Sequence, residues 1–307
     1  MKKVLAIVGP TAVGKTAMSI KLARQFQGEI ISGDSMQVYR GLDIGTAKVT
    51  AAEKQGVVHH LIDVRNITER FSVADFVAEA SRLIDEIIAR DHLPIIAGGT
   101  GFYLQALLEG LELGGDQFES DELRRQLMET VQQAGKTALY ERLKKVDPKA
   151  AEQISPNNVR RVIRALEVYL KTGRRFSDQV NHPRRYDPLI IGLTTERQKL
   201  YARINQRVDL MMTRGLLEEA RYLYDKGGNR LQAGKGIGYH EFYDYFEHNI
   251  DLSTAVDNVK KDSRHYAKRQ LTWFRNKTKP TWYDVIDCPD DVKRLQHDVE
   301  EWLQTKD

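Results

Sequence analysis

The sequence predicts an α/β fold in which helices flank a parallel sheet and an all-helical insertion interrupts the chain. In the first third of the chain, short apolar runs alternate with amphipathic stretches, which is typical of a parallel sheet covered on both faces. From about residue 116 the chain becomes charge-rich and helical, until "PLIIGLTT" at 188–195 restores a strand-like run. We therefore predict one sheet whose strands come from both sides of an insertion.

The individual elements follow from their periodicity. The runs "KVLAIVG", "GEIISGD" and "LPIIAGGTG" are predicted as buried strands, with "HHLIDV" as a further candidate. Between them, "GKTAMSIKLARQF" and "SVADFVAEASRLIDEIIARD" have the period of helices. In the insertion, "ISPNNVRRVIRALEVYLKTG" predicts a helix capped by Ser155, with Pro156 in its first position and Gly173 at its end.

These elements divide the chain into three parts. Residues 1–115 are predicted as the first part of the α/β core, and residues 116–186 as the helical insertion. Residues 187–307 are predicted to return to the core and to be mostly helical.

The composition excludes several classes of protein. With one cysteine, Cys288, the 307 residues cannot form a disulfide framework or a cysteine-based metal site, which fits a cytoplasmic protein. No run approaches the roughly 18 apolar residues of a membrane helix, and the amino terminus lacks the features of a signal peptide. We expect a cytoplasmic protein without a membrane partner.

The segment "GPTAVGKT" matches the phosphate-binding loop pattern G-x-x-x-x-G-K-[ST] between a predicted strand and a predicted helix. Such a loop surrounds phosphate oxygens with backbone N–H groups at a helix N-terminus. Lys15 would pair with the terminal phosphate and Thr16 would ligate Mg²⁺, the expected cofactor. This motif predicts a P-loop NTPase-like core, with nucleotide (ATP) binding as a further expectation.

The acidic residue that usually accompanies a phosphate-binding loop follows a different strand in this sequence. In P-loop hydrolases a late strand usually ends in an acid, but "LPIIAGG" ends in glycines and the acid is Asp34, after the second strand. A carboxylate there would hold metal or accept a proton from a nucleophile. The pattern fits both a small-molecule kinase and a transferase with a pyrophosphate leaving group, and spacing alone does not separate them.

The basic residues are concentrated in two stretches of a chain whose net charge is only +4. Residues 155–186 carry eight Lys or Arg against two acids, and residues 260–279 carry eight against one, which indicates a polyanionic partner. In the second stretch, we expect Tyr266 and Phe274 to lie on a buried face. Lys260, Arg264 and Lys268 would form an RNA-contacting stripe on the opposite face.

Together the motifs resemble the bacterial tRNA dimethylallyltransferase (tRNA isopentenyltransferase) family. The resemblance spans most of the chain and rests on nine segments in order. They are "GPTAVGKT", "DSMQVYRGLDIGTAK", "HHLIDV", "FSVADF", "GGTGFYLQALLEG", "SPNNVRRVIRALEVY", "RINQRVDLMM", "GIGYHEF" and "YAKRQLTWFR".

The resemblance implies a prenyl transfer from dimethylallyl diphosphate to the N6 amine of an adenosine beside the tRNA anticodon. It implies that Asp34 is the general base, that Thr100 lies beside the reacting groups and that Arg207 supports the leaving diphosphate. The resemblance implies that the loop residues Thr11, Ala12, Val13, Gly14, Lys15 and Thr16 bind the diphosphate, and we expect Gly9 at the start of the loop to contribute. Arg203 lies four residues before Arg207 on the same predicted helix face and is a further expected diphosphate contact.

The resemblance also implies a set of contacts to the anticodon stem-loop, made by a protein that we expect to be a monomer. Besides Asp34 and Thr100, the implied contacts are Ser35, Met36, Gln37, Arg124, Arg160, Arg161, Val162, Ile163, Arg164, Lys235, Gly236, Ile237, Gly238, Tyr239 and His240. Among these, Tyr239 would stack on a base.

Three other functions remain open on the sequence: an ATP-dependent small-molecule kinase, an isopentenyltransferase acting on free adenylate, and an RNA-binding protein with an inactive loop. The basic helical insertion favours tRNA over a small metabolite as the substrate.

Overall fold

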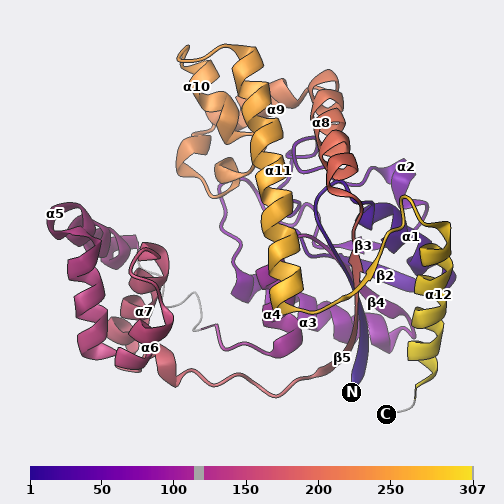
Figure 1. The fold of residues 1–307 in the computed structure, drawn as a ribbon, viewed down its shortest axis with the longest axis horizontal. Helices are drawn as coiled ribbons and strands as arrows, with labels where there is room; N and C mark the ends of the chain where they lie inside the picture. Colours follow the sequence, from indigo (N-terminus) through magenta and orange to yellow (C-terminus); the bar gives the residue numbers. More distant parts are fainter. Residues whose placement is uncertain (114–120, 306–307) are drawn as a thin grey trace. The chain divides into compact units, whose positions relative to one another are not determined.

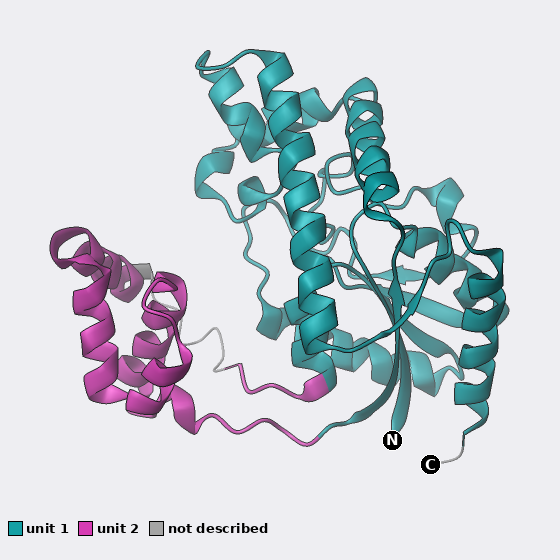
Figure 2. Cartoon of the chain, in the orientation of Figure 1, with its two compact units in different colours: residues 1–108, 184–307 teal, residues 109–183 magenta. Residues whose placement is uncertain are grey.

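The computed structural model describes residues 1–113 and 121–305, which fall into two compact units (Figure 2). The first unit contains residues 1–108 and 184–307, and the second contains residues 109–183. The predicted start of the insertion, residue 116, lies outside the described residues. The second unit ends at Pro183, before the predicted end at residue 186.

A six-stranded sheet lies at the centre of the first unit, with the order β3-β2-β4-β1-β5-β6 and parallel pairing throughout (Figure 1). The strands are β1 (Lys2–Val8), β2 (Gly28–Ser32), β3 (His59–His60), β4 (Leu93–Ala97), β5 (Tyr186–Leu193) and β6 (Thr281–Tyr283). Because β5 pairs with β1 along its length, the sheet does contain strands from both sides of the insertion, as predicted.

One strand is shorter than its sequence pattern. The run "HHLIDV" contributes only the two residues of β3, because Leu61 and Asp63 adopt positive φ angles of 59° and 56° and turn the chain out of the sheet.

Helices cover both faces of the sheet because alternate strand side chains point in opposite directions. Leu5 and Ile7 of β1 pack in one core cluster with α1, α8 and α12, whereas Val4 and Ala6 pack in another with α3 and α4. The helices of this unit are α1 (Lys15–Gln25), α2 (Ala51–Lys54), α3 (Val73–Ala89), α4 (Gly101–Glu109), α8 (Arg197–Thr213), α9 (Leu216–Asp225), α10 (Tyr243–Phe246), α11 (Leu252–Lys277) and α12 (Pro289–Gln304). None of the described helices is both long and apolar enough to cross a membrane.

The second unit is helical in its described residues and has its own core. It contains α5 (Asp121–Val146), α6 (Pro148–Gln153) and α7 (Val159–Thr172), and α5 is broken at Gly135, whose backbone is not helical. The predicted cap of α7 was wrong: Asn158 accepts the capping hydrogen bond from the Arg161 amide, so the helix begins at Val159. Gly173 ends α7 in the left-handed conformation, as predicted.

Candidate active site

A cavity of about 1090 Å³ opens where β1, β2 and β4 end. Its walls are the loop Thr11–Thr16 after β1, the segment after β2 that carries Asp34, and residues 43–50. Residues of α8 and α11 are also part of the lining. The cavity thus lies at the carboxyl ends of parallel strands, where ligands bind in folds of this kind.

The phosphate-binding loop has the backbone that its glycines predict. Gly9 has a φ of +144°, and a Cβ there would lie 2.6 Å from the Leu193 carbonyl oxygen. Gly14 has a φ of +100° at the start of α1. Both positions therefore disfavour any residue with a side chain. The first residues of α1 line the cavity, so an anion in the cavity would meet the positive end of this helix.

Lys15 lies inside this loop and donates hydrogen bonds to the carbonyl oxygens of Gly9 (2.9 Å) and Pro10 (2.7 Å). The pKa of Lys15 is lowered to about 7, mainly by burial and also by nearby Arg207, whereas Asp34 acts in the opposite direction. An anion beside Lys15 would favour its charged form, so this side chain is suited to bind phosphate.

Two arginines on α8 face the loop, one turn apart. The Arg203 Nε donates to the Ala12 carbonyl oxygen over 3.0 Å, and Arg207 Nη1 lies 3.5 Å from Thr11 Oγ1. Burial lowers the pKa of Arg207, and neighbouring Arg203 adds to this effect. Cations placed together in this way disfavour one another without an anion, and a bound diphosphate would relieve that repulsion.

Among the acids that line the cavity, Asp34 lies on the segment after β2, and burial raises its pKa. The effects of the Met36 amide, which donates to Asp34 Oδ1 over 2.8 Å, and of the Lys15 charge oppose this rise. One carboxylate oxygen of Asp34 is therefore fixed by a hydrogen bond from the backbone two residues later, and the residue lines the cavity. A raised pKa makes a carboxylate a better proton acceptor.

Not every predicted residue of this site lines the cavity. Thr100 lies behind the Asp34 segment, where its hydroxyl oxygen accepts a hydrogen bond from the Ser35 amide over 3.1 Å. Thr100, Ser35, Met36 and Gly9 are not among the lining residues of the described chain; the Gly9 carbonyl oxygen accepts a hydrogen bond from Lys15 instead. Gln37 does line the cavity.

The sequence analysis missed Gln270 as a cavity residue. This buried side chain of α11 accepts a hydrogen bond from the Thr11 amide (2.8 Å) and donates one to the Gly99 carbonyl oxygen (3.0 Å). It therefore joins the loops that follow β1 and β4. No local pattern marks it, because its partners are about 170 and 260 residues away in the chain.

Glu219 of α9 was also missed. Its carboxylate accepts hydrogen bonds from the backbone amides of Asp43, Ile44 and Gly45 and from the Tyr239 hydroxyl. These contacts hold the segment 43–45 at the rim of the cavity.

Several predicted RNA contacts in the second unit are used inside that unit. Val162 and Ile163 are buried in its core, so the prediction that they contact tRNA was wrong for their side chains. Arg124 forms a bidentate pair with buried Glu167, and Arg164 donates to the Leu113 carbonyl oxygen. Arg160 and Arg161 are exposed.

The segment 235–240 is only partly accessible. Tyr239 is fully buried and donates to Glu219 over 2.8 Å, so the expectation that it stacks on a base was wrong. Gly236 and Gly238 are buried, Ile237 is half-buried, and Lys235 and His240 are exposed.

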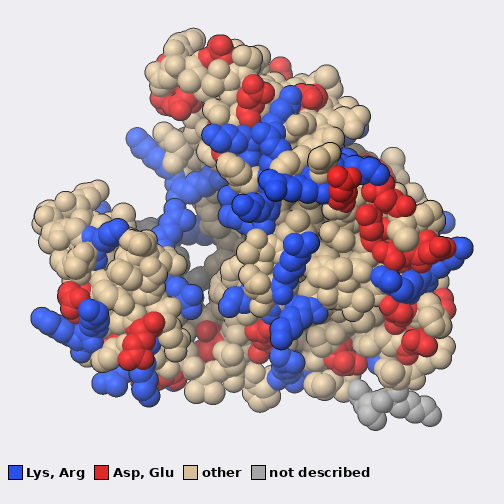
Figure 3. Space-filling model, viewed as in Figure 1, with Lys and Arg blue, Asp and Glu red and all other residues tan. Residues whose placement is uncertain are grey.

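Of the three residues in the predicted basic stripe on α11, two contact α8 and one is exposed. Lys260 pairs with Asp209 (2.6 Å) and Arg264 donates to Asn205 (2.6 Å), both on α8, whereas Lys268 is exposed. Lys and Arg side chains gather along α11 on the face of the first unit shown in Figure 3. The exposed ones on this helix are Lys261, Lys268, Arg269, Arg275 and Lys277.

Comparison with known proteins supports the motif-based resemblance over the whole chain. The family model described as IPP transferase matches residues 37–277. A tRNA dimethylallyltransferase of Limosilactobacillus reuteri is 58% identical over 306 residues, covering 99% of this chain and all of the relative. The chain belongs to the tRNA dimethylallyltransferase family. Members of this family are prenyltransferases, so the cavity is the candidate active site of a transferase.

Solved structures of relatives share the fold. The full-length tRNA isopentenylpyrophosphate transferase from Bacillus halodurans is 50% identical with a TM-score of 0.74, and the match covers 98% of this chain and 96% of that one. A eukaryotic dimethylallyltransferase acting on tRNA is 33% identical with a TM-score of 0.81, covering 94% and 75% of the two chains. The P-loop core and its insertion are thus a family architecture.

Proposed function

We propose that the chain transfers a dimethylallyl group from dimethylallyl diphosphate to the N6 amine of an adenosine next to the tRNA anticodon, releasing diphosphate. The observation that carries this proposal is the cavity itself, in which Asp34 and the Lys15 loop share one space with Arg203 and Arg207. An acid and a set of cations in one cavity fit a proton acceptor beside an anionic leaving group. The names of the relatives supply the donor and acceptor classes.

The proposed reaction makes one bond and breaks one. The adenine nitrogen bonds to the allylic carbon while the C–O bond to diphosphate breaks, and the electron pair of that bond stays on the departing oxygen. Lys15, Arg203, Arg207 and the loop amides stabilise the negative charge that develops there. The proton released from the nitrogen moves to Asp34.

The residues present fit a magnesium ion. Thr16 is an exposed residue in the cavity wall, and its hydroxyl oxygen is a hard donor of the kind that Mg²⁺ prefers. The cation would add positive charge beside the diphosphate oxygens. Thr16 is therefore the residue that we propose to ligate it.

For the tRNA, we propose that the anticodon stem-loop is held by exposed basic residues while the target base is extruded into the cavity. Candidates are Arg160 and Arg161 of the second unit and Lys235 of the first. We propose that the protein acts as a monomer. A tRNA substrate also agrees with the cytoplasmic location expected from the sequence.

The experiment is to incubate the protein with dimethylallyl diphosphate, Mg²⁺ and unmodified tRNA, and to analyse the nucleosides by mass spectrometry. We expect prenylated adenosine at the position beside the anticodon. Parallel reactions contain AMP instead of tRNA, or ATP instead of the prenyl donor. Modification of AMP with comparable efficiency, or phosphate transfer from ATP without prenylation, would contradict the proposal.

A further inference from the structure

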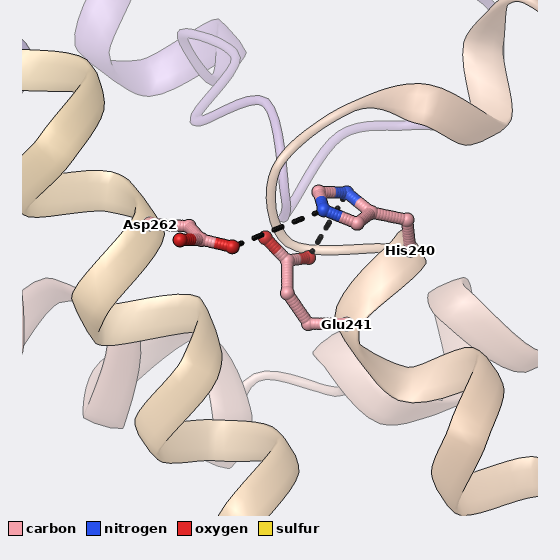
Figure 4. Close-up of side chains that lie close together, drawn as sticks. All are labelled: His240, Glu241 and Asp262. Carbon is pink, nitrogen blue, oxygen red and sulfur yellow. Dashed lines mark ion pairs between the residues drawn. The ribbon is translucent and has the colours of Figure 1, made fainter.

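Three side chains that the proposed reaction does not use gather between the segment 236–242 and α11 (Figure 4). His240 and Glu241 come from the short 3-10 turn His240–Phe242, and Asp262 comes from α11. One ligand-type atom from each lies within 4.8 Å of the other two. A nitrogen and two carboxylate oxygens thus converge from two separate segments of the chain.

His240 is oriented with one ring nitrogen available. Its Nδ1 lies 2.9 Å from the Gly236 carbonyl oxygen, and because a carbonyl only accepts hydrogen bonds, Nδ1 is the nitrogen that carries the proton. Nε2 then presents its lone pair in the neutral ring, 3.9 Å from Asp262 Oδ2. Metal-binding histidines are commonly fixed through the second ring nitrogen in this way.

Glu241 provides an independent observation that favours a bound cation. Its side chain is 2% exposed, and its Oε2 accepts a hydrogen bond from the Gly238 amide over 2.9 Å. Its Oε1 is buried and has no hydrogen-bond partner among the described residues. In Figure 4 one oxygen of this carboxylate lies toward Asp262 and the other toward His240. An unpaired buried carboxylate oxygen near a second acid is costly unless a cation or a proton lies beside it.

We propose that His240, Glu241 and Asp262 bind a divalent transition-metal ion of the zinc class. Imidazole together with carboxylates suits this class, whereas calcium and magnesium prefer all-oxygen ligands. Asp262 and His240 are about two-fifths exposed, so both side chains can close around an ion held by the buried Glu241. Water would complete the coordination.

The ion would cross-link the segment 236–242 to α11. This segment contains Tyr239, which holds Glu219 at the rim of the active-site cavity, and α11 carries Gln270, which joins two loops of that cavity. The metal would therefore stabilise the arrangement of both elements without entering the reaction. The inference does not depend on the identity of the prenyl donor or acceptor.

The test uses the full chain, stripped of metal with a chelator, in a titration with Zn²⁺ followed by calorimetry. We expect the wild type to bind Zn²⁺ at this site and its melting temperature to rise. Asp262→Asn, which alters none of the proposed tRNA contacts, should weaken that binding at least tenfold and abolish the rise. His240→Gln should do the same, and Co²⁺ bound to the wild type should show absorption bands that both variants lose.

The matched control is His297→Gln, which removes an exposed histidine that pairs with Glu301 at 3.3 Å on α12. It should bind Zn²⁺ as the wild type does. Zinc binding that is equal in the wild type and Asp262→Asn, or absent from both, would overturn the proposal. A melting temperature of Glu241→Gln that equals that of the wild type, with no zinc dependence in either, would show a shared proton in place of a metal.

Discussion

Asp34 is the residue on which the proposed chemistry depends most directly. Replacing it with alanine removes the proton acceptor, and we expect turnover to fall by roughly 10²- to 10⁴-fold. Affinity for tRNA should stay within a few fold, because phosphate contacts elsewhere dominate that affinity. Single-turnover prenylation and filter binding measure the two effects separately.

The control is Asp43→Asn, which removes a carboxylate that also lines the cavity but is 63% exposed. Its turnover should change little. If Asp34→Ala retains near wild-type turnover, the base has been assigned to the wrong residue.

The lowered pKa of Lys15 predicts that anion binding depends on pH. Its pKa of about 7 means that the free protein loses this proton as the pH rises above 7, whereas a bound diphosphate raises the pKa and restores the charge. Affinity for inorganic pyrophosphate should therefore decrease with rising pH. At pH 8.5, binding should take up about one proton more in the wild type than in Lys15→Met.

Calorimetry in two buffers of different ionisation enthalpy counts these protons. The ionisation of pyrophosphate itself is common to both proteins and cancels in the comparison. Equal proton uptake in the two proteins would mean that Lys15 is already fully charged in the free cavity.

At the scale of elements, α11 connects two loops of the cavity through Gln270. This side chain forms hydrogen bonds with one backbone group in the loop after β1 and one in the loop after β4. Gln270→Leu has a similar size but leaves the Thr11 amide and the Gly99 carbonyl without this partner. We expect a loss of about 1–3 kcal/mol in the free energy of unfolding for each group left unsatisfied. Urea denaturation measures the loss, and the KM for the prenyl donor should rise as the loop loosens.

Lys268→Gln is the comparison variant, since Lys268 is exposed on the same helix. It should unfold like the wild type. A Gln270→Leu protein with unchanged stability and KM would show that water replaces the amide at no cost.

At the scale of the whole molecule, the two units have separate cores and should respond separately to damage. Arg124→Met removes the bidentate partner of the fully buried Glu167. Because Arg124 is 37% exposed and Arg164 remains 3.9 Å from Glu167, we expect a loss of about 1–3 kcal/mol in the free energy of unfolding. Hydrogen exchange should increase across α5 and α7 but not in β1 or β4. Mass spectrometry of peptides measures this directly.

Arg125→Met is the matched control, because Arg125 is exposed and pairs with Glu122 only at the surface. Exchange in the second unit should then stay as in the wild type. Equal loss of protection in both units on Arg124→Met would mean that they unfold as one.

The sequence by itself determined the features that depend on neighbours along the chain. These local features are the strand and helix periods, the glycines of the phosphate loop and the position of Asp34 after a strand. They were enough to predict the sheet and the part of the cavity formed by the loop and Asp34. The family resemblance added Arg207, and helical spacing from Arg207 added Arg203; without the resemblance, neither is distinguished from a surface arginine.

Only the tertiary structure decided which polar side chains are free and which are used in packing. Tyr239 looked available for a base but is buried against Glu219, and Arg264 looked available for RNA but binds Asn205. Likewise, Gln270 reaches loops far away in sequence, and His240 meets Asp262 across two elements. Burial and hydrogen-bond partners depend on which segments the fold brings together. The order of residues along the chain does not show which distant segments will be neighbours in space.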